Sequence, residues 1–193
     1  MKEGYEMIIR KNYLINAKTV LFYGIYYENG ALFTLVIEGN DKFLVAMAPL
    51  KLIDKTLISY GSSFKGALES SRKLLGENRK MYPLKIDASL DIWIFPSKSY
   101  KKENCVWFAL NHVENTKLLG IKDTKVFLDY GHEINIEMRE TSFRNKRGSA
   151  EDLRDIILRN TKGELKYSDV PTERWTIVEE MGKYECRGKK EEE

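Results

Sequence analysis

The chain has 193 residues, of which 42% are hydrophobic and 32% charged, with a net charge of +3. This length and composition predict one soluble globular domain plus a tail, without an apolar run long enough for a membrane span. The first six residues are charged and lack an apolar stretch, so we expect no secretory signal. The two cysteines, Cys105 and Cys186, are far apart in sequence, so we expect a cytoplasmic chain without a disulfide framework or a zinc site.

The first half of the chain is predicted to be rich in strands. Residues 19–27 and 31–37 contain many β-branched and aromatic side chains, and Asn29-Gly30 between them favours a type I′ hairpin turn. Residues 43–47 follow a second turn and extend the meander. Residues 50–60 are predicted as a further strand that stops at Gly61.

The second half is predicted to mix helices and strands. A helix is expected over residues 62–76, because serines precede an apolar stripe and Gly76 suits the C-terminal end. Residues 90–95 and 105–110 are predicted strands joined by a basic loop, and residues 126–129 and 133–138 form a second hairpin. A second helix is predicted to begin at Ser149.

The remaining C-terminal segment has fewer apolar residues. Residues 171–181 are compatible with one short amphipathic helix, which would dock a regulator or pack on the domain. The end, residues 187–193, is expected to be disordered. We therefore assign residues 1–162 to a DNA-binding domain and residues 163–193 to a partly disordered tail, a candidate for regulation or self-association.

These elements together predict an α+β fold, with β-rich meander or barrel-like sheets and about two helices packed on them. Strands separate the two predicted helices, so no helix-turn-helix is expected. Positive charge is concentrated in residues 51–102, with eleven basic and five acidic residues, and in residues 141–162, with six and three. Such clustering fits a polyanion binder and a solvated lysine-rich surface equally well.

The sequence offers little for catalysis. Cys105 and His112 are the one conceivable nucleophile and base, but residues seven apart on a strand point to opposite faces. No nucleotide-binding, metal-binding or hydrolase motif appears. We therefore expect a protein that is not an enzyme and that holds no cofactor and no metal.

Several short motifs in a fixed order resemble the ComK family, the competence transcription factors of low-GC Gram-positive bacteria. They are Pro49-Leu50 with Ile53, Tyr60-Gly61-Ser62-Ser63-Phe64-Lys65-Gly66, Ile94-Phe95-Pro96-Ser97, Cys105-Val106-Trp107 with His112-Val113, and Ser142-Phe143-Arg144-Asn145 with Leu153-Arg154. The resemblance covers residues 5–160. The chain departs from the family pattern at Ala67, Leu110, Lys146 and Ser149, which indicates a divergent member or paralogue.

The resemblance implies an activator of transcription that binds A/T-rich promoter boxes in double-stranded DNA through the minor groove, as a dimer or tetramer. It also implies action with RNA polymerase at the nucleoid, and control by an adaptor and a Clp-type protease. The narrow minor groove of A-tracts attracts Arg and Lys side chains, so specificity would come from DNA shape.

The candidate DNA-contacting residues are the basic side chains of the two blocks and of the loop at 96–102. They are Lys65, Arg72, Lys73, Arg79, Lys80, Lys98, Lys101, Lys102, Arg144, Lys146 and Arg147. Most are expected to contact phosphates, and Arg72 or Arg147 to enter the groove. The alternative is a small β-rich module that binds a protein or single-stranded nucleic acid, with Tyr60, Tyr82 and Tyr100 as stacking platforms.

Overall fold

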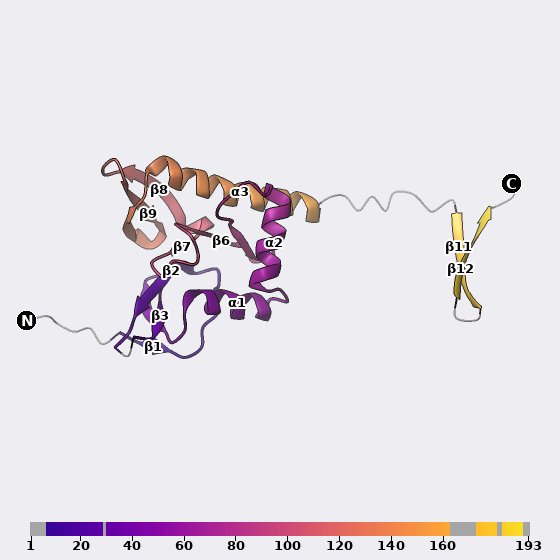
Figure 1. Cartoon of the computed structure of the whole chain (residues 1–193), viewed down its shortest axis with the longest axis horizontal. Helices are drawn as coiled ribbons and strands as arrows, with labels where there is room; N and C mark the ends of the chain where they lie inside the picture. The colour runs from indigo at the N-terminus through magenta and orange to yellow at the C-terminus, as the bar shows by residue number, and fades with distance from the viewer. Residues whose placement is uncertain (1–6, 29, 163–172, 181–182, 191–193) are drawn as a thin grey trace, which may run out of the picture. The chain divides into compact units, whose positions relative to one another are not determined.

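A computed structural model describes residues 7–28, 30–162, 173–180 and 183–190. The chain forms two compact units, the first ending at Arg159 and the second running from Asn160. A seven-stranded sheet in the order β1-β4-β3-β2-β7-β6-β5 is the centre of the first unit (Figure 1). Its strands are β1 (Ile9–Arg10), β2 (Thr19–Tyr26), β3 (Leu32–Glu38), β4 (Asp41–Val45), β5 (Leu84–Asp87), β6 (Ile92–Pro96) and β7 (Val106–Ala109).

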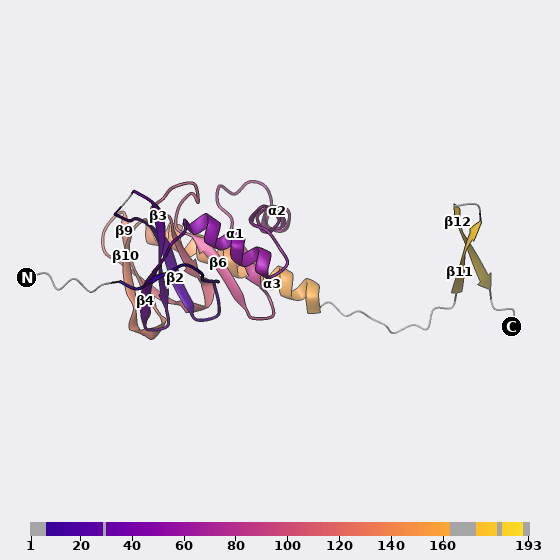
Figure 2. The ribbon, with the colours of Figure 1, turned by 90° about the horizontal axis from the view of Figure 1, so that it is seen from below.

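Each face of this sheet carries its own hydrophobic core. The helices α1 (Pro49–Ser59) and α2 (Phe64–Leu75) cover one face, and α3 (Glu140–Lys162) lies over the other (Figure 2). Side chains alternate along β6, so Ile92 and Ile94 pack with α1 and α2 while Trp93 and Phe95 pack with α3. The sheet is therefore buried on both sides at β6.

A smaller antiparallel sheet, in the order β10-β9-β8, shares the second core with α3. It consists of β8 (Val113–Leu118), β9 (Asp123–Leu128) and β10 (Glu133–Glu137), and short 3-10 turns lie at Leu110–His112 and Asp129–Gly131. The α+β prediction is confirmed, with three helices instead of about two. Within the described residues 7–28 and 30–162, neither sheet closes into a barrel.

The helix predicted over residues 62–76 is confirmed as α2. The Ser63 hydroxyl accepts a hydrogen bond from the Gly66 amide at 3.1 Å, which satisfies one free donor of the first turn. Gly76 follows the last helical residue with a φ of +85°, a conformation that glycine adopts without strain. The two predicted hairpins, β2–β3 and β9–β10, are also confirmed.

The prediction of a strand over residues 50–60 is wrong, because this segment forms α1. Its β-branched residues favour a strand locally, but the apolar side chains recur at helical spacing. Pro49 stands in the first turn, where a proline costs no hydrogen bond. The buried face that packs on the sheet consists of Leu52, Ile53, Thr56 and Leu57.

The prediction that no two helices are consecutive is wrong for the same reason. Only Tyr60–Ser63 separates α1 from α2, and the two helices lie crosswise in Figures 1 and 2. The Asp54 carboxylate of α1 accepts a hydrogen bond from the Phe64 amide at 2.9 Å, which fixes the start of α2. The pair therefore has the connectivity of a helix-turn-helix.

The start of the last helix is also mispredicted, since α3 begins at Glu140 and not at Ser149. Phe143 is fully buried, and its ring lies 5.5 Å from that of Phe95 and 5.1 Å from that of Phe108. The Ser149 hydroxyl donates to the Asn145 carbonyl at 2.8 Å, a bond made inside a helix. Tertiary packing of Phe143 thus extends the helix by nine residues.

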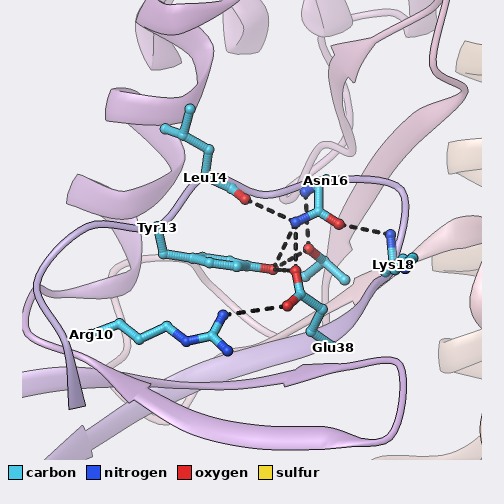
Figure 3. Close-up of polar contacts among 7 residues, drawn as sticks. Arg10, Tyr13, Leu14, Asn16, Lys18 and Glu38 are labelled. Atoms are coloured by element: carbon cyan, nitrogen blue, oxygen red, sulfur yellow. Dashed lines mark hydrogen bonds and ion pairs between the residues drawn. The ribbon is translucent and has the colours of Figure 1, made fainter. Parts of the chain in front are cut away.

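A polar cluster holds the segment between β1 and β2 against the end of β3 (Figure 3). The Tyr13 hydroxyl lies 2.5 Å from the Thr19 hydroxyl and donates to the Glu38 carboxylate at 3.0 Å. Asn16 donates to the same carboxylate at 2.6 Å, and Arg10 pairs with it at 3.4 Å. Burial raises the pKa of Tyr13, so its hydroxyl stays a donor.

The second unit contains an antiparallel hairpin of β11 (Glu173–Glu180) and β12 (Lys183–Lys190). The short helix expected over residues 171–181 is therefore wrong for residues 173–180, where Trp175 to Val178 favour a strand. Residues 187–190, expected to be disordered, belong to β12. The rest of both expectations lies outside the described residues.

Candidate nucleic-acid interface

The two basic blocks of the sequence meet at a cavity of about 430 Å³ beside α3. Arg79 and Lys80, which follow α2, line one side, and Lys146 of α3 lines the other. Pro83, Phe95 and Pro96 give the cavity an apolar part, and its polar residues are Ser142, Asn145 and Ser149. The cavity thus gathers three cationic side chains in a place that the sequence alone does not reveal.

Arg79 joins the two sides of this cavity. Its guanidinium donates to the Ser149 hydroxyl and lies 3.6 Å from the Asp152 carboxylate. The backbone of Arg79 is fixed as well, because its amide donates to the Tyr82 hydroxyl at 3.3 Å. The loop after α2 is therefore held against α3, and the charge of Arg79 is partly neutralised.

Lys146 differs from Arg79 because it has no acidic partner in the described part of the chain. Among the described residues, its half-buried ammonium donates to the Met81 sulfur alone, at 3.3 Å. Burial lowers the pKa of Lys146, since removing water disfavours the charged form. An anion entering the cavity would restore the lost interactions of this ammonium.

Arg72 lies close to the same loop. Its guanidinium carbon is 5.7 Å from the centre of the Tyr82 ring, and Tyr82 in turn contacts Arg79. Lys73 is exposed and pairs with Glu69 at 3.5 Å, an exposed pair that adds little stability. Arg72 therefore lies beside the loop that carries Arg79, but it does not line the cavity.

The second basic block is split between two flanks of α3. Arg144 and Arg147 lie on the flank that faces β8, where they pair with Glu140 at 2.8 Å and Glu151 at 3.0 Å. Arg147 also donates to the Glu114 carbonyl of β8 at 3.4 Å. Their charges are compensated within the protein, unlike that of Lys146.

The remaining predicted contacts lie apart from the cavity. Lys98 faces a separate pocket beside β10, and Lys101 and Lys102 line a pocket beside Tyr26 of β2. Lys65 is at the first turn of α2, where the neighbouring Phe64 packs edge-on against Tyr100 at 5.4 Å. The structure therefore gathers Arg79, Lys80 and Lys146 at one cavity, places Arg72 near the loop that carries Arg79, and leaves the loop lysines elsewhere.

Sequence reasoning missed Ser142 and Asn145 as polar residues of the cavity, because it began the helix too late. The signal was present, since Phe143, Ala150 and Leu153 recur at helical spacing. One stacking platform of the alternative interpretation is wrong. Tyr82 is only 4% exposed, and its hydroxyl donates to the Gly76 carbonyl at 2.9 Å.

Cys105 and His112 do not form a catalytic pair. The buried Cys105 sulfur donates to the Lys98 carbonyl at 3.3 Å, and burial raises the pKa of its thiol. His112 instead contacts the Asp129 carboxylate and the Ala17 carbonyl, both at 2.8 Å. The arrangement indicates structural roles for both side chains.

We expect Cys105 to resist alkylation in the folded protein. Its thiol is protonated and inaccessible at neutral pH, so iodoacetamide should label it at least roughly 100-fold more slowly than in urea, through local opening only. Peptide mass spectrometry distinguishes Cys105 from Cys186 and gives the rate for each. Native labelling of Cys105 as fast as in urea would contradict this expectation and revive the enzyme hypothesis.

Other chemistry is not evident in the described residues. Within them, no three His, Cys, Asp or Glu side chains gather as metal ligands. No helix among them is long and apolar enough to cross a membrane. The cationic cavity is therefore the candidate site that the described side chains support best.

Comparison with known proteins shows to which family the chain belongs. The ComK protein family matches residues 10–162, which is more than half of the chain. The chain belongs to the ComK family. It is 28% identical over 118 residues to the competence transcription factor of Bacillus subtilis (strain 168), and the match covers 61% of each chain. The matched region is thus less than two thirds of that relative, and no solved structure matches the chain.

The ComK match includes every residue of the cavity. It begins at Arg10, which belongs to the polar cluster of Figure 3, and ends at Lys162 with α3. The hairpin β11–β12 lies outside it. The resemblance inferred from the ordered motifs is therefore confirmed for the first compact unit.

Proposed function

We propose that the chain is a transcription regulator that binds A/T-rich double-stranded DNA and is not an enzyme. The observation that carries this proposal is the cavity where cations of both basic blocks meet and where Lys146 has no acidic partner among the described residues. A DNA phosphate is an anion of suitable size for that position. Membership in the ComK family and a relative named as a transcription factor support the same function.

Phosphate contact is the role that this surface suits. Arg72, Lys80 and Lys146 present positive charge without carboxylates bound to them in the described structure, whereas Arg144 and Arg147 are paired. Contacts to phosphates position a protein on DNA but do not read its sequence. We therefore propose that selectivity for A/T boxes comes from the shape of the minor groove.

The remaining parts of the proposal rest on the resemblance to the ComK family. Residues 1–162 would form the DNA-binding domain, and residues 163–193 a segment for regulation or self-association. Binding as a dimer or tetramer, action with RNA polymerase at the nucleoid, and control by an adaptor and a Clp-type protease are part of this proposal. Two half-sites spaced along the duplex would then match two copies of the cationic cavity.

Fluorescence anisotropy with three probes tests the proposal. We expect a duplex with paired A-tract and T-tract boxes to bind at least about 100-fold more tightly than a mixed duplex, and more tightly than either single strand. A preference for single strands would favour the alternative of a single-strand-binding module. Equal binding to both duplexes would leave only a non-specific polyanion binder.

The α1–α2 pair offers a second mode of DNA binding, through the major groove. Ligands that occupy only one groove distinguish it from binding through the minor groove. Lys65, Arg72 and Lys73 are exposed on α2, and a helix in this position of a helix-turn-helix reads the major groove. Netropsin, a minor-groove ligand of A/T tracts, should displace the protein, and the major-groove ligand methyl green should not. The opposite result would assign recognition to α2.

A further inference from the structure

The hairpin β8–β9 ends in an exposed apolar tip that the phosphate-binding surface does not explain. Leu118, Leu119 and Ile121 are 56%, 49% and 82% exposed, within four consecutive residues. Most of the other large exposed apolar side chains in residues 7–161 are scattered along the described chain. These three side chains contribute little to the stability of the fold, because they bury little of their surface in the described structure.

Hydrogen bonds within the hairpin and to α3 order the segment that carries the tip. The amides of Leu119 and Gly120 both donate to the Asp123 carbonyl, at 3.0 and 3.3 Å, so the turn is closed by its own backbone. The middle of β8 is fixed to α3, because the Thr116 hydroxyl donates to the Glu140 carboxylate at 2.7 Å. Figure 1 shows β8 beside the beginning of α3. The tip therefore projects from the small sheet, whose strand β8 adjoins the flank of α3 that carries Arg144 and Arg147.

Two lysines directly adjoin the apolar residues of the tip. Lys117 and Lys122 flank the three apolar residues, are exposed, and have no ion pair within the described residues. Lys125 is paired with Glu133 at 2.7 Å, and Asp123 is the acidic side chain in the turn itself. Glu137 lies opposite Asp123 across the β9–β10 pair, so two lysines adjoin the apolar residues and two carboxylates lie at the end of the sheet behind them.

The size of the tip decides between two partners. A stable contact with a second copy buries roughly 800 Å² per partner, more than a four-residue loop supplies. Proteins that bind the minor groove often insert Leu, Ile or similar side chains between base pairs, with cationic residues on the neighbouring phosphates. An apolar tip between two lysines, on a two-stranded ribbon, has the chemistry of such a wedge.

We infer that Leu118, Leu119 and Ile121 form a wedge that enters the minor groove of the bound DNA, partly unstacks a base step and bends the duplex. This inference rests on the proposed function and adds a specificity element to it. Flexible steps such as TA unstack at low cost, so the wedge would select A/T-rich boxes at a position where no base is hydrogen-bonded. Lys117 and Lys122 would contact the phosphates on either side.

The test compares the wild type with one triple and one double serine variant, all on the same duplex with paired A-tract and T-tract boxes. The wedge variant carries Leu118→Ser, Leu119→Ser and Ile121→Ser. The matched control carries Ile58→Ser and Leu90→Ser, two apolar residues that are 61% and 51% exposed elsewhere. Binding is measured by anisotropy, bending by energy transfer between the duplex ends, and unstacking by 2-aminopurine fluorescence within the boxes.

The wild type and the control should bend the duplex and raise 2-aminopurine fluorescence. The wedge variant should still bind, with affinity reduced about tenfold because its phosphate contacts remain, but without the bend or the fluorescence rise. A wedge variant that bends DNA like the wild type overturns the wedge and leaves the DNA-binding proposal intact. A wild type that binds no duplex overturns both.

Sedimentation without DNA separates the remaining alternative. The wedge variant should have the same oligomeric state as the wild type and the control. If only the wedge variant dissociates, the tip is an interface between copies of the chain, and the wedge is overturned. Circular dichroism of all three proteins should be superimposable, because each substituted side chain is exposed.

Discussion

Reversing the charges of Lys80 and Lys146 is expected to weaken binding to the A/T-box duplex by about 100-fold. Each reversal removes one charge-assisted contact to phosphate, worth about 1.5 kcal/mol, and about 1.4 kcal/mol corresponds to a tenfold change in affinity. The salt dependence should fall as well, since each lost phosphate contact lowers the slope of log K against log salt by about 0.9. Anisotropy titrations at several salt concentrations measure both effects.

A matched variant controls for net charge. Lys18→Glu with Lys42→Glu changes the total charge by the same amount at two exposed lysines outside the basic blocks. This control should bind within about threefold of the wild type, because its charges are distant from the phosphates and screened. If both variants lose affinity equally, the cavity is not the contact site.

Lys146→Met tests the same site without introducing a buried negative charge. Methionine keeps the aliphatic part of the side chain next to Met81 and removes only the ammonium. It should lower the slope of log K against log salt by about half as much as the double reversal does, while leaving the protein folded. An unchanged slope in Lys146→Met would exclude this ammonium from the interface.

Replacing Phe143 with alanine is expected to lower the free energy of unfolding by about 3–5 kcal/mol, the usual cost of deleting a buried aromatic ring. The ring is fully buried between Phe95 and Phe108, so its loss leaves a cavity under the first turns of α3. Urea denaturation followed by tryptophan fluorescence measures the change.

The control for this variant is Leu118→Ala, which removes an exposed apolar side chain. It should change the free energy of unfolding by less than about 0.5 kcal/mol. A loss below about 1 kcal/mol in Phe143→Ala would show that α3 is not held by this ring. In that case Lys146 and Arg79 would not be fixed at one cavity.

Local patterns predicted the elements whose signals lie within a short stretch of sequence. The β9–β10 hairpin follows from alternating Ile134, Ile136 and acidic or polar neighbours, and α2 follows from Ser63 and Gly76 at its ends. The ordered ComK-like motifs span most of the first compact unit, so the family was also accessible. Short strands with mixed patterns, such as β5 and β8, gave no such signal.

Errors arose where local propensity and packing disagree. Residues 50–60 contain β-branched side chains, yet burying Leu52, Ile53 and Leu57 together against the sheet requires a helix. Ser149 is typical of a helix start, yet the site for Phe143 between two rings extends the helix to Glu140. In both cases the gain from burial exceeds the local preference.

The sequence by itself determined the α+β class, the family and the two blocks of positive charge. Only the tertiary structure decided which cations lie together, because Arg79 and Lys146 are brought to one cavity by the packing of α3 on β6. It also decided that Arg144 and Arg147 are paired with carboxylates while Lys146 has none within the described part of the chain, since each pairing depends on which flank of α3 a side chain occupies. The number and order of the charges follow from the sequence, but the desolvation and pairing of each charge depend on where folding places its side chain.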